Sequence, residues 1–237
     1  MSVTRQQDAV DRVTRKSLGY EATRIIRARI MDGKYKPGER MGIEELAERL
    51  GVSTQPIREA LVTLGTEGIL EVLPHRGFRV AAVHRRDIEH TIRVHAFIAG
   101  LLAAEAAAVI SPTSIARLRE IQAEIERVAR MPRDDWQVAV LEDANFNFHR
   151  TINLVPEAPR LRWFLRAATH YVPRRDFTNW VDTTVRAHPP IIDALERHDA
   201  ATARSLVEDH VMKAAPPLIA NLVAAGILVE DEDDNNG

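Results

Sequence analysis

The pattern of apolar and polar positions predicts three helices in the N-terminal part of the chain. Apolar residues recur at helical spacing at Leu18, Ala22, Ile25, Ile26 and Ile30. Asp32-Gly33 ends this helix, and a second, short helix runs over 43–50 with Gly51 after its end. Ser53 is the expected N-cap of a third helix, whose first turn accommodates Pro56. The predicted buried stripe of the third helix is Ile57, Ala60, Leu61 and Leu64.

A β-hairpin is predicted after the third helix. Two short runs with strand character, 69–72 and 78–80, flank the sequence Pro74-His75-Arg76-Gly77, which forms a basic tip. Helix, tight turn, helix and hairpin in this order are typical of a winged helix-turn-helix. The N-terminal part of the chain is therefore expected to have this architecture.

Beyond residue 82 the strand signals vanish and the periodicity predicts a helical bundle. The expected helices are 86–109, 113–130, 135–154, 157–171, 178–197 and 200–225. Ser111-Pro112 is typical of a helix start, whereas Pro189-Pro190 predicts that the fifth of these helices kinks or restarts. The predicted fold class is mainly α: an N-terminal winged helix-turn-helix with a small β-hairpin wing, followed by a C-terminal all-α helical bundle.

Formal charge divides the chain in the same place as the helix and strand pattern. Residues 1–86 carry a net charge of +5 and residues 87–237 a net charge of −7, within a total of −2. A basic module joined to an acidic one suggests a polyanionic partner for the first module alone. We expect a mobile arm over 1–14, the winged helix-turn-helix over 15–82, the helical domain over 83–228 and a disordered acidic tail over 229–237.

The sequence gives no cysteine-based site, no membrane span and no secretion signal. The chain has no cysteine, so disulfides and thiolate metal sites are excluded. No apolar run approaches the roughly 18 residues of a membrane span, and the N-terminus lacks the apolar core of a secretion signal. We therefore expect a cytoplasmic protein without a membrane partner.

The candidate DNA-binding residues lie on the third helix and on the hairpin. Ser53, Thr54, Gln55 and Arg58 point away from the buried stripe, where hydroxyl, amide and guanidinium groups suit phosphates and base edges in a major groove. The hairpin tip adds His75, Arg76 and Gly77, near the DNA backbone or minor groove. The alternative is that each of these polar residues is simply solvated.

Four residues on three predicted helices form a candidate metal site. Asn145 and His149 are four positions apart and share one helix face, and His188 and His210 lie on two later helices. Three imidazoles and an amide oxygen suit Zn²⁺, Ni²⁺, Mn²⁺ or Fe²⁺. From spacing alone, a histidine in a helix is more often a surface residue or a hydrogen-bonded core residue than a metal ligand.

The first module resembles the GntR family of bacterial regulators. The resemblance rests on residues 43–61, with the core Pro56-Ile57-Arg58-Glu59-Ala60-Leu61, on Glu67-Gly68-Ile69 and on the hairpin sequence 74–78. It covers about 18–82 and implies a DNA contact by Arg58. Relatives often have Arg and Thr where this chain has Thr54 and Gln55, so their operator sequences do not transfer.

The second module is similar to the FCD effector domain of the FadR-like GntR subfamily over about 86–226. The similarity rests on residues 145–149, His188, residues 191–195, Asp199 and His210. It implies a helical bundle in which an Asp-x-x-x-His pair and two later histidines bind a metal. This chain departs from the pattern at Asn145, which replaces the Asp, and at the prolines after His188. His95 and Ala99 replace a frequent Arg-x-x-x-Glu pair, which makes His95 a candidate effector contact.

Together these features predict a ligand-responsive transcriptional regulator, most simply a repressor. It would bind a palindromic double-stranded DNA operator as a homodimer, because one chain carries one recognition helix. The resemblance implies a small organic or sugar acid as effector, together with a divalent metal. Two alternatives stay open from the sequence: a metal-dependent, hydrolase-like enzyme, and a constitutive DNA-binding protein whose effector pocket has decayed.

Overall fold

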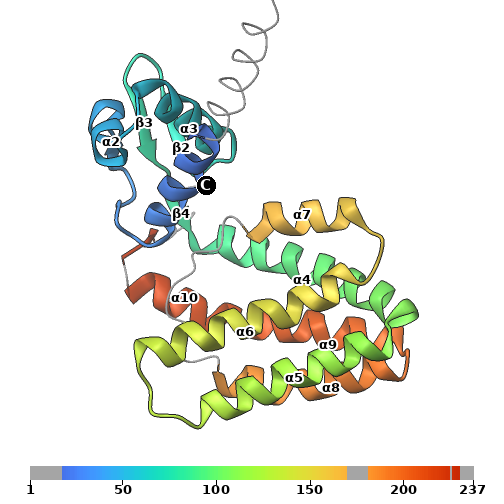
Figure 1. Cartoon of the computed structure of the whole chain (residues 1–237). Coiled ribbons are helices and arrows are strands. Elements are labelled where there is room, and N and C mark those ends of the chain that lie inside the picture. The colour runs from blue at the N-terminus through green and yellow to red at the C-terminus, as the bar shows by residue number, and fades with distance from the viewer. Residues whose placement is uncertain (1–17, 170–180, 225, 230–237) are drawn as a thin grey trace, which may run out of the picture. The chain divides into compact units, whose positions relative to one another are not determined.

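The chain forms two compact units in a computed structural model that describes residues 18–169, 181–224 and 226–229. One unit comprises residues up to His84 together with those from Ala225 onward, and the other comprises Arg85–Ala224 (Figure 1). The predicted N-terminal arm over 1–14 and the acidic tail beyond Val229 lie outside the described residues. Each unit is described by itself below.

The first unit is a winged helix-turn-helix. A helix over 18–31 precedes β1 (Arg40–Met41), α2 (Ile43–Leu50), α3 (Thr54–Thr66), β2 (Leu70–Leu73) and β3 (Gly77–Val80). Both strand pairs are antiparallel, in the order β1-β3-β2. Gly51 ends α2 in the left-handed conformation, with φ of 66°, and so allows the tight turn into α3. The predicted architecture is confirmed.

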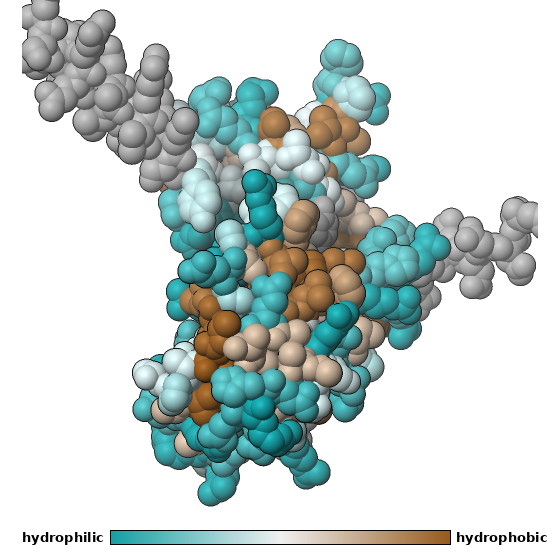
Figure 2. All heavy atoms as spheres, turned by 90° about the vertical axis from the view of Figure 1, so that its right-hand side faces the viewer, coloured by the Kyte–Doolittle hydropathy of each residue, from teal (hydrophilic) through white to brown (hydrophobic). Residues whose placement is uncertain are grey.

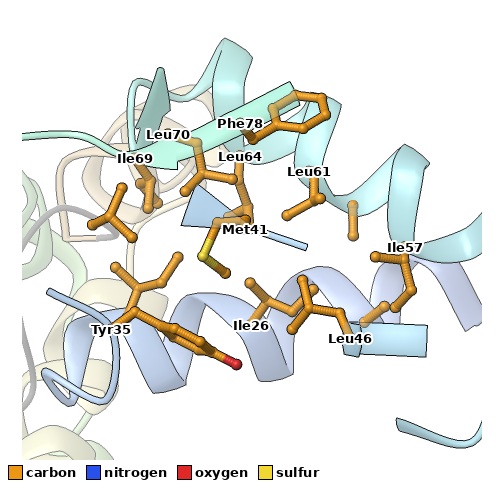
Figure 3. Close-up of a cluster of buried hydrophobic side chains, with 14 of the residues drawn as sticks. Ile26, Tyr35, Met41, Leu46, Ile57, Leu61, Leu64, Ile69, Leu70 and Phe78 are labelled. Atoms are coloured by element: carbon orange, nitrogen blue, oxygen red, sulfur yellow. The ribbon is translucent and has the colours of Figure 1, made fainter. Parts of the chain in front are cut away.

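Apolar side chains from the helices and the sheet point toward one another in one core (Figure 3). The stripe predicted for α3, which comprises Ile57, Ala60, Leu61 and Leu64, is fully buried. Leu18, expected on the buried face of the first helix, is 41% exposed. This core fixes α3 so that its opposite face remains at the surface.

The C-terminal residues return to the first unit. Leu228–Val229 (β5) pairs in parallel with Val83–His84 (β4), and the Ile227 side chain before β5 is buried. The sequence pattern gave no indication of this pairing, because each strand has only two residues.

The second unit is an all-α bundle. Its described helices are α4 (Arg85–Val109), α5 (Pro112–Ala129), α6 (Asp135–Leu154), α7 (Pro159–Thr169), α8 (Val181–Glu196), α9 (Ala200–Lys213) and α10 (Ala215–Ala224). Helix α5 packs against α6 and α8, while α4 and α8 pack against α9 (Figure 1). Gly100 permits the close approach of α4 to α9, since a Cβ at this position would lie 2.4 Å from Cγ of Glu208. The predicted bundle is confirmed.

Prolines account for the differences between predicted and observed helices. The helix expected over 200–225 is broken at Ala214, where Pro216 and Pro217 fall in the first turn of α10 and need no internal hydrogen-bond donor there. In contrast, α8 continues through Pro189 and Pro190, so the expected restart does not occur. The start of α5 is as predicted: Ser111 accepts a hydrogen bond from the Ser114 N–H, and Pro112 is the first helical residue.

Among the described helices, one, α4, has the length and apolar composition of a membrane-spanning helix. It packs against α6, α7, α8, α9 and α10 and contributes ten buried residues, as expected of the core helix of a bundle. Some large apolar side chains of the bundle are nevertheless exposed, including Val94, Phe97, Trp163 and Phe164. Figure 2 shows hydrophobic residues gathered among polar ones on one face of the molecule.

Candidate DNA-binding surface and metal centre

The start of α3 presents the four residues proposed to contact DNA. Ser53, Thr54, Gln55 and Arg58 are all exposed. Ser53 occupies the N-cap position with φ of −70° and ψ of 166°, but its hydroxyl makes no capping hydrogen bond. Ser53 is therefore the N-cap residue of α3 as predicted, and its hydroxyl lies at the surface beside Thr54 and Gln55.

One of these side chains is held by a residue that sequence reasoning missed. Gln55 donates from Nε2 to Oε1 of Glu59, one turn further along α3, at 3.0 Å. The other carboxylate oxygen of Glu59 lies against the first helix, since a Cβ on Gly19 would be 3.0 Å from it. Glu59 therefore links the first helix to the exposed end of α3.

The hairpin tip is a tight turn that exposes His75, Arg76 and Gly77. The Arg76 N–H donates to the Leu73 carbonyl at 2.9 Å, and His75 has a φ of 59° at the third position of this turn. A positive φ at this position, after a proline, is the pattern of a type II turn. Behind the tip, Arg79 donates to the Glu71 carboxylate at 2.7 Å, so the Arg79 charge is partly neutralised.

The second site lies inside the bundle, where three helices bring their histidines together. His149 on α6, His188 on α8 and His210 on α9 place one ring nitrogen each within 4.8 Å of one another. His188 is fully buried and His210 is 8% exposed. Asn145 lies one helical turn before His149 on α6. The three histidines, which were predicted to form one site together with Asn145, therefore do lie close together.

Several polar atoms of this constellation are buried without a hydrogen-bond partner. They are Oδ1 of Asn145, Nε2 of His188 and Nδ1 of His210. Nε2 of His149 and Nε2 of His210 lie 3.0 Å apart, so in the metal-free protein one of them donates a hydrogen to the other. Buried polar groups are normally hydrogen-bonded, so an unpartnered atom on each of three candidate ligand residues is typical of a site that binds a ligand.

The imidazoles are neutral in this environment. Burial lowers the pKa of His188 from 6.5 to about 2 and that of His210 to about 4, with a smaller effect from neighbouring charges. Burial, followed by the charges of His210, His188 and His95, lowers the pKa of His149 well below its usual value. Neutral imidazoles keep a lone pair at pH 7, which a metal ion requires.

His95 on α4 is a fourth histidine near this cluster. Burial lowers its pKa from 6.5 to about 4. A charge on His95 would lower the pKa of both His149 and His210, so His95 interacts electrostatically with both rings. His95 is not a member of the group of ligand nitrogens.

One pair of these donors has the separation expected of two ligands on one divalent metal. Two nitrogens bound at about 2.1 Å to one metal lie about 3.0 Å apart at a right angle and about 3.4 Å apart at the tetrahedral angle. The 3.0 Å separation between His149 and His210 agrees with this range. Imidazole nitrogens with an oxygen donor suit Zn²⁺, Ni²⁺, Mn²⁺ and Fe²⁺.

Two neighbours of His188 were not predicted from the sequence. Phe148 stacks on the His188 ring, with centroids 3.6 Å apart and planes at 3°. Gln122 on α5, itself buried, places its Oε1 3.1 Å from Nδ1 of His188. Phenylalanine and glutamine are not usual metal ligands, so a search of the sequence for ligand spacing does not find either residue.

Both units match known protein families. Residues 19–80 match the family described as bacterial regulatory proteins, gntR family, and residues 90–213 match the FCD domain. The chain is also 30% identical over 208 residues to an uncharacterised HTH-type transcriptional regulator of Mycobacterium tuberculosis, a match that covers 86% of this chain and 82% of the relative. The chain belongs to the GntR family and carries an FCD domain. The resemblances inferred from residues 43–61 and 145–210 are thus confirmed.

Further relatives agree with this assignment. The chain is 26% identical to a protein of Paenarthrobacter nicotinovorans named "Probable D-xylose utilization operon transcriptional repressor", over 86% of this chain and 90% of the relative. The fold is similar to that of Escherichia coli McbR/YncC, with a TM-score of 0.63 and 21% identity over 88% of this chain and 96% of the other. Members of these families regulate transcription, so this chain is a DNA-binding transcriptional regulator and not an enzyme. The metal-dependent hydrolase alternative is set aside.

Proposed function

We propose that this GntR-family regulator is a ligand-responsive repressor whose bundle binds a divalent metal and a small organic or sugar acid. Ser53, Thr54, Gln55 and Arg58 contact the operator in the major groove, and the tip formed by His75, Arg76 and Gly77 approaches the backbone or minor groove. The exposure of all seven residues supports this assignment. The regulator acts in the cytoplasm, where bacterial DNA lies.

The observation that carries the metal proposal is the set of orphaned buried atoms. Asn145, His149, His188 and His210 supply one oxygen and three nitrogen donors, and Asn145, His188 and His210 each have a buried atom without a partner. A bound divalent metal would satisfy Oδ1 of Asn145 and Nε2 of His188, while His210 would bind through Nε2, the nitrogen that lies 3.0 Å from Nε2 of His149, and not through its orphaned Nδ1. An ion with more than four coordination positions would also offer a position to a carboxylate. The neutral amide of Asn145 is a poorer ligand for a hard cation than Asp, so this site binds metal more weakly than one with Asp. His95, which interacts electrostatically with His149 and His210, is the candidate contact for the acid.

Repression and a sugar-derived effector are supported by the relative named for D-xylose utilisation, which is itself named as a repressor. Binding as a homodimer to a palindromic operator is supported by the single recognition helix of each chain. Exposed apolar side chains on the bundle, among them Phe97 and Trp163, leave surface that a second copy would cover.

The experiment begins with the full chain freed of metal by a chelator. Operator sequences are selected from random double-stranded DNA, and the affinity for the selected DNA is measured by fluorescence anisotropy at fixed salt. Zn²⁺, Ni²⁺ or Mn²⁺ is then added with a panel of organic and sugar acids. We expect a pairing of metal and acid that weakens DNA binding at least tenfold.

Sedimentation on the same samples tests the dimer. A monomer that binds the selected DNA with full affinity would contradict the proposed symmetry. An affinity that no metal and no acid changes would contradict the sensor and support the constitutive alternative. If the acids weaken DNA binding equally well in the presence of chelator, the role of the metal is contradicted and the role of the acid is not.

A further inference from the structure

Gln122 is a buried glutamine whose amide has three partners. It is 4% exposed, on the face of α5 that packs against α8. Its Nε2 donates to the Val185 carbonyl at 3.0 Å and to Oε1 of Glu126 at 2.9 Å. Its Oε1 lies 3.1 Å from Nδ1 of His188.

These partners determine which way the amide faces. The Val185 carbonyl and the Glu126 carboxylate only accept hydrogen bonds, so the nitrogen of the amide must face them. The amide oxygen must then face His188, and because this oxygen only accepts, Nδ1 of His188 must carry the hydrogen. A neutral imidazole carries one N–H, so Nε2 of His188 keeps its lone pair. This Nε2 is the buried atom without a partner in the histidine cluster.

The acceptor on α8 exists because of a proline beside the ligand. In a regular helix, the carbonyl of Val185 accepts from the N–H four residues later. That residue is Pro189, which has no N–H, and Gln122 supplies the missing hydrogen bond from α5. The proline that follows His188 therefore creates the bond that orients Gln122, and Gln122 in turn sets the tautomer of His188.

A second contact holds the plane of the same ring. Phe148, which is fully buried, stacks in parallel on His188 at a centroid distance of 3.6 Å. Stacking restrains the tilt of the ring but leaves open which nitrogen is protonated. That choice is left to the hydrogen bond with Gln122.

We propose that Gln122 is a positioning residue for the metal centre, which sets the Nδ1–H tautomer of His188 and so aims the Nε2 lone pair at the other ligands. The proposal rests on the proposed metal site but concerns a residue that does not touch the metal. Loss of such an outer hydrogen bond typically lowers metal affinity 10- to 100-fold.

The test compares Gln122→Leu with a matched control, Gln137→Leu. Gln137 is likewise buried, at 6% exposure, and its Nε2 donates to two backbone carbonyls, of Val128 and Met131. It lies two turns before Asn145 on α6 and has no partner in the histidine cluster in the bonds described for it. Both variants lose a buried amide and leave backbone carbonyls unsatisfied, so a comparable loss of thermal stability is expected.

Two measurements on the full chain separate the variants. Zn²⁺ affinity is measured by competition with a chromophoric chelator, and the His188 tautomer is measured in metal-free protein from imidazole ¹⁵N chemical shifts. Gln122→Leu should weaken Zn²⁺ binding about 10- to 100-fold and should populate the Nε2–H tautomer. Gln137→Leu should leave both the affinity and the tautomer as in the wild type. Gln122→Glu keeps an acceptor for Nδ1–H, so it should preserve the tautomer. It is the variant to measure if Gln122→Leu does not fold.

Three results would overturn the proposal: an Nε2–H tautomer in the wild type, unchanged Zn²⁺ affinity in Gln122→Leu, or an equal loss of affinity in Gln137→Leu. If the wild type takes up no Zn²⁺, the metal site itself is refuted. The tautomer of the metal-free protein then still decides whether Gln122 sets the protonation of His188.

Discussion

Acid should destabilise the metal-free bundle through its buried histidines. His188 and His210 have pKa values lowered from 6.5 to about 2 and about 4, because burial disfavours the charged ring. In the unfolded chain both rings would titrate near 6.5. Between pH 6.5 and the folded pKa values, the unfolded state therefore binds more protons than the native state. Stability is fully present above pH 6.5 and falls as the pH is lowered.

The size of this effect follows from the two shifts. Between pH 7 and pH 5, each ring contributes a loss of about 2 kcal/mol in the free energy of unfolding, or about 4 kcal/mol for the two together. His149 shifts in the same direction and adds to the loss. A bound metal opposes the effect, because it competes with protons for the same lone pairs.

Tryptophan fluorescence in urea reports on the bundle, since the described tryptophans, Trp136 and Trp163, belong to the unit Arg85–Ala224 and the first unit has no tryptophan in its sequence. Unfolding is followed at pH 7, 6 and 5 with a chelator present. His210→Gln, which removes one titrating ring, should lose about 2 kcal/mol less over this range than the wild type. His198→Ala is the control, because His198 is exposed and lies outside the cluster. A wild-type stability that does not change between pH 7 and pH 5 would refute the neutral, buried state of the cluster.

Three further predictions concern single positions. Arg58→Ala should weaken binding to the selected operator by about 1–3 kcal/mol in anisotropy titrations at matched salt. The fold should stay intact because Arg58 is exposed. Unchanged affinity would show that α3 presents another face to DNA. Asn145→Asp adds a charged oxygen donor and should tighten Zn²⁺ binding in calorimetric titrations, so equal or weaker binding would exclude this position as a ligand. Gly100→Ala should destabilise the bundle by about 1–3 kcal/mol in urea, because its Cβ would meet Glu208. Adding Glu208→Ala should recover most of that loss, and a loss that persists in the double variant would place the strain elsewhere.

Local periodicity was sufficient to predict the parts of the fold that local rules control. The buried stripe from Ile57 to Leu64 follows from 3.6-residue spacing, and the start of α5 follows from Ser111-Pro112. The histidines of the candidate site were singled out by their spacing on the predicted helices together with the resemblance to the FCD domain.

What the sequence could not show depends on partners far away in the chain. Pro189-Pro190 was expected to kink or restart α8. The helix does not restart there, and the Val185 carbonyl, which lacks its usual donor, is bonded by Gln122, 63 residues earlier in the chain. The pairing of β4 with β5 joins Val83 to Leu228, which are 145 residues apart in the sequence. In both cases the deciding bond is made by a tertiary contact, which spacing does not encode.

The most direct test of the central proposal is calorimetric titration of Zn²⁺ into the chelator-stripped full chain. Wild type is expected to bind one ion per chain at the site formed by Asn145, His149, His188 and His210. His149→Ala and His210→Ala should lose this binding, and His198→Ala should retain it. If wild type takes up no Zn²⁺, or if both cluster variants bind it as tightly as wild type, the histidines are structural and effector binding must depend on other residues.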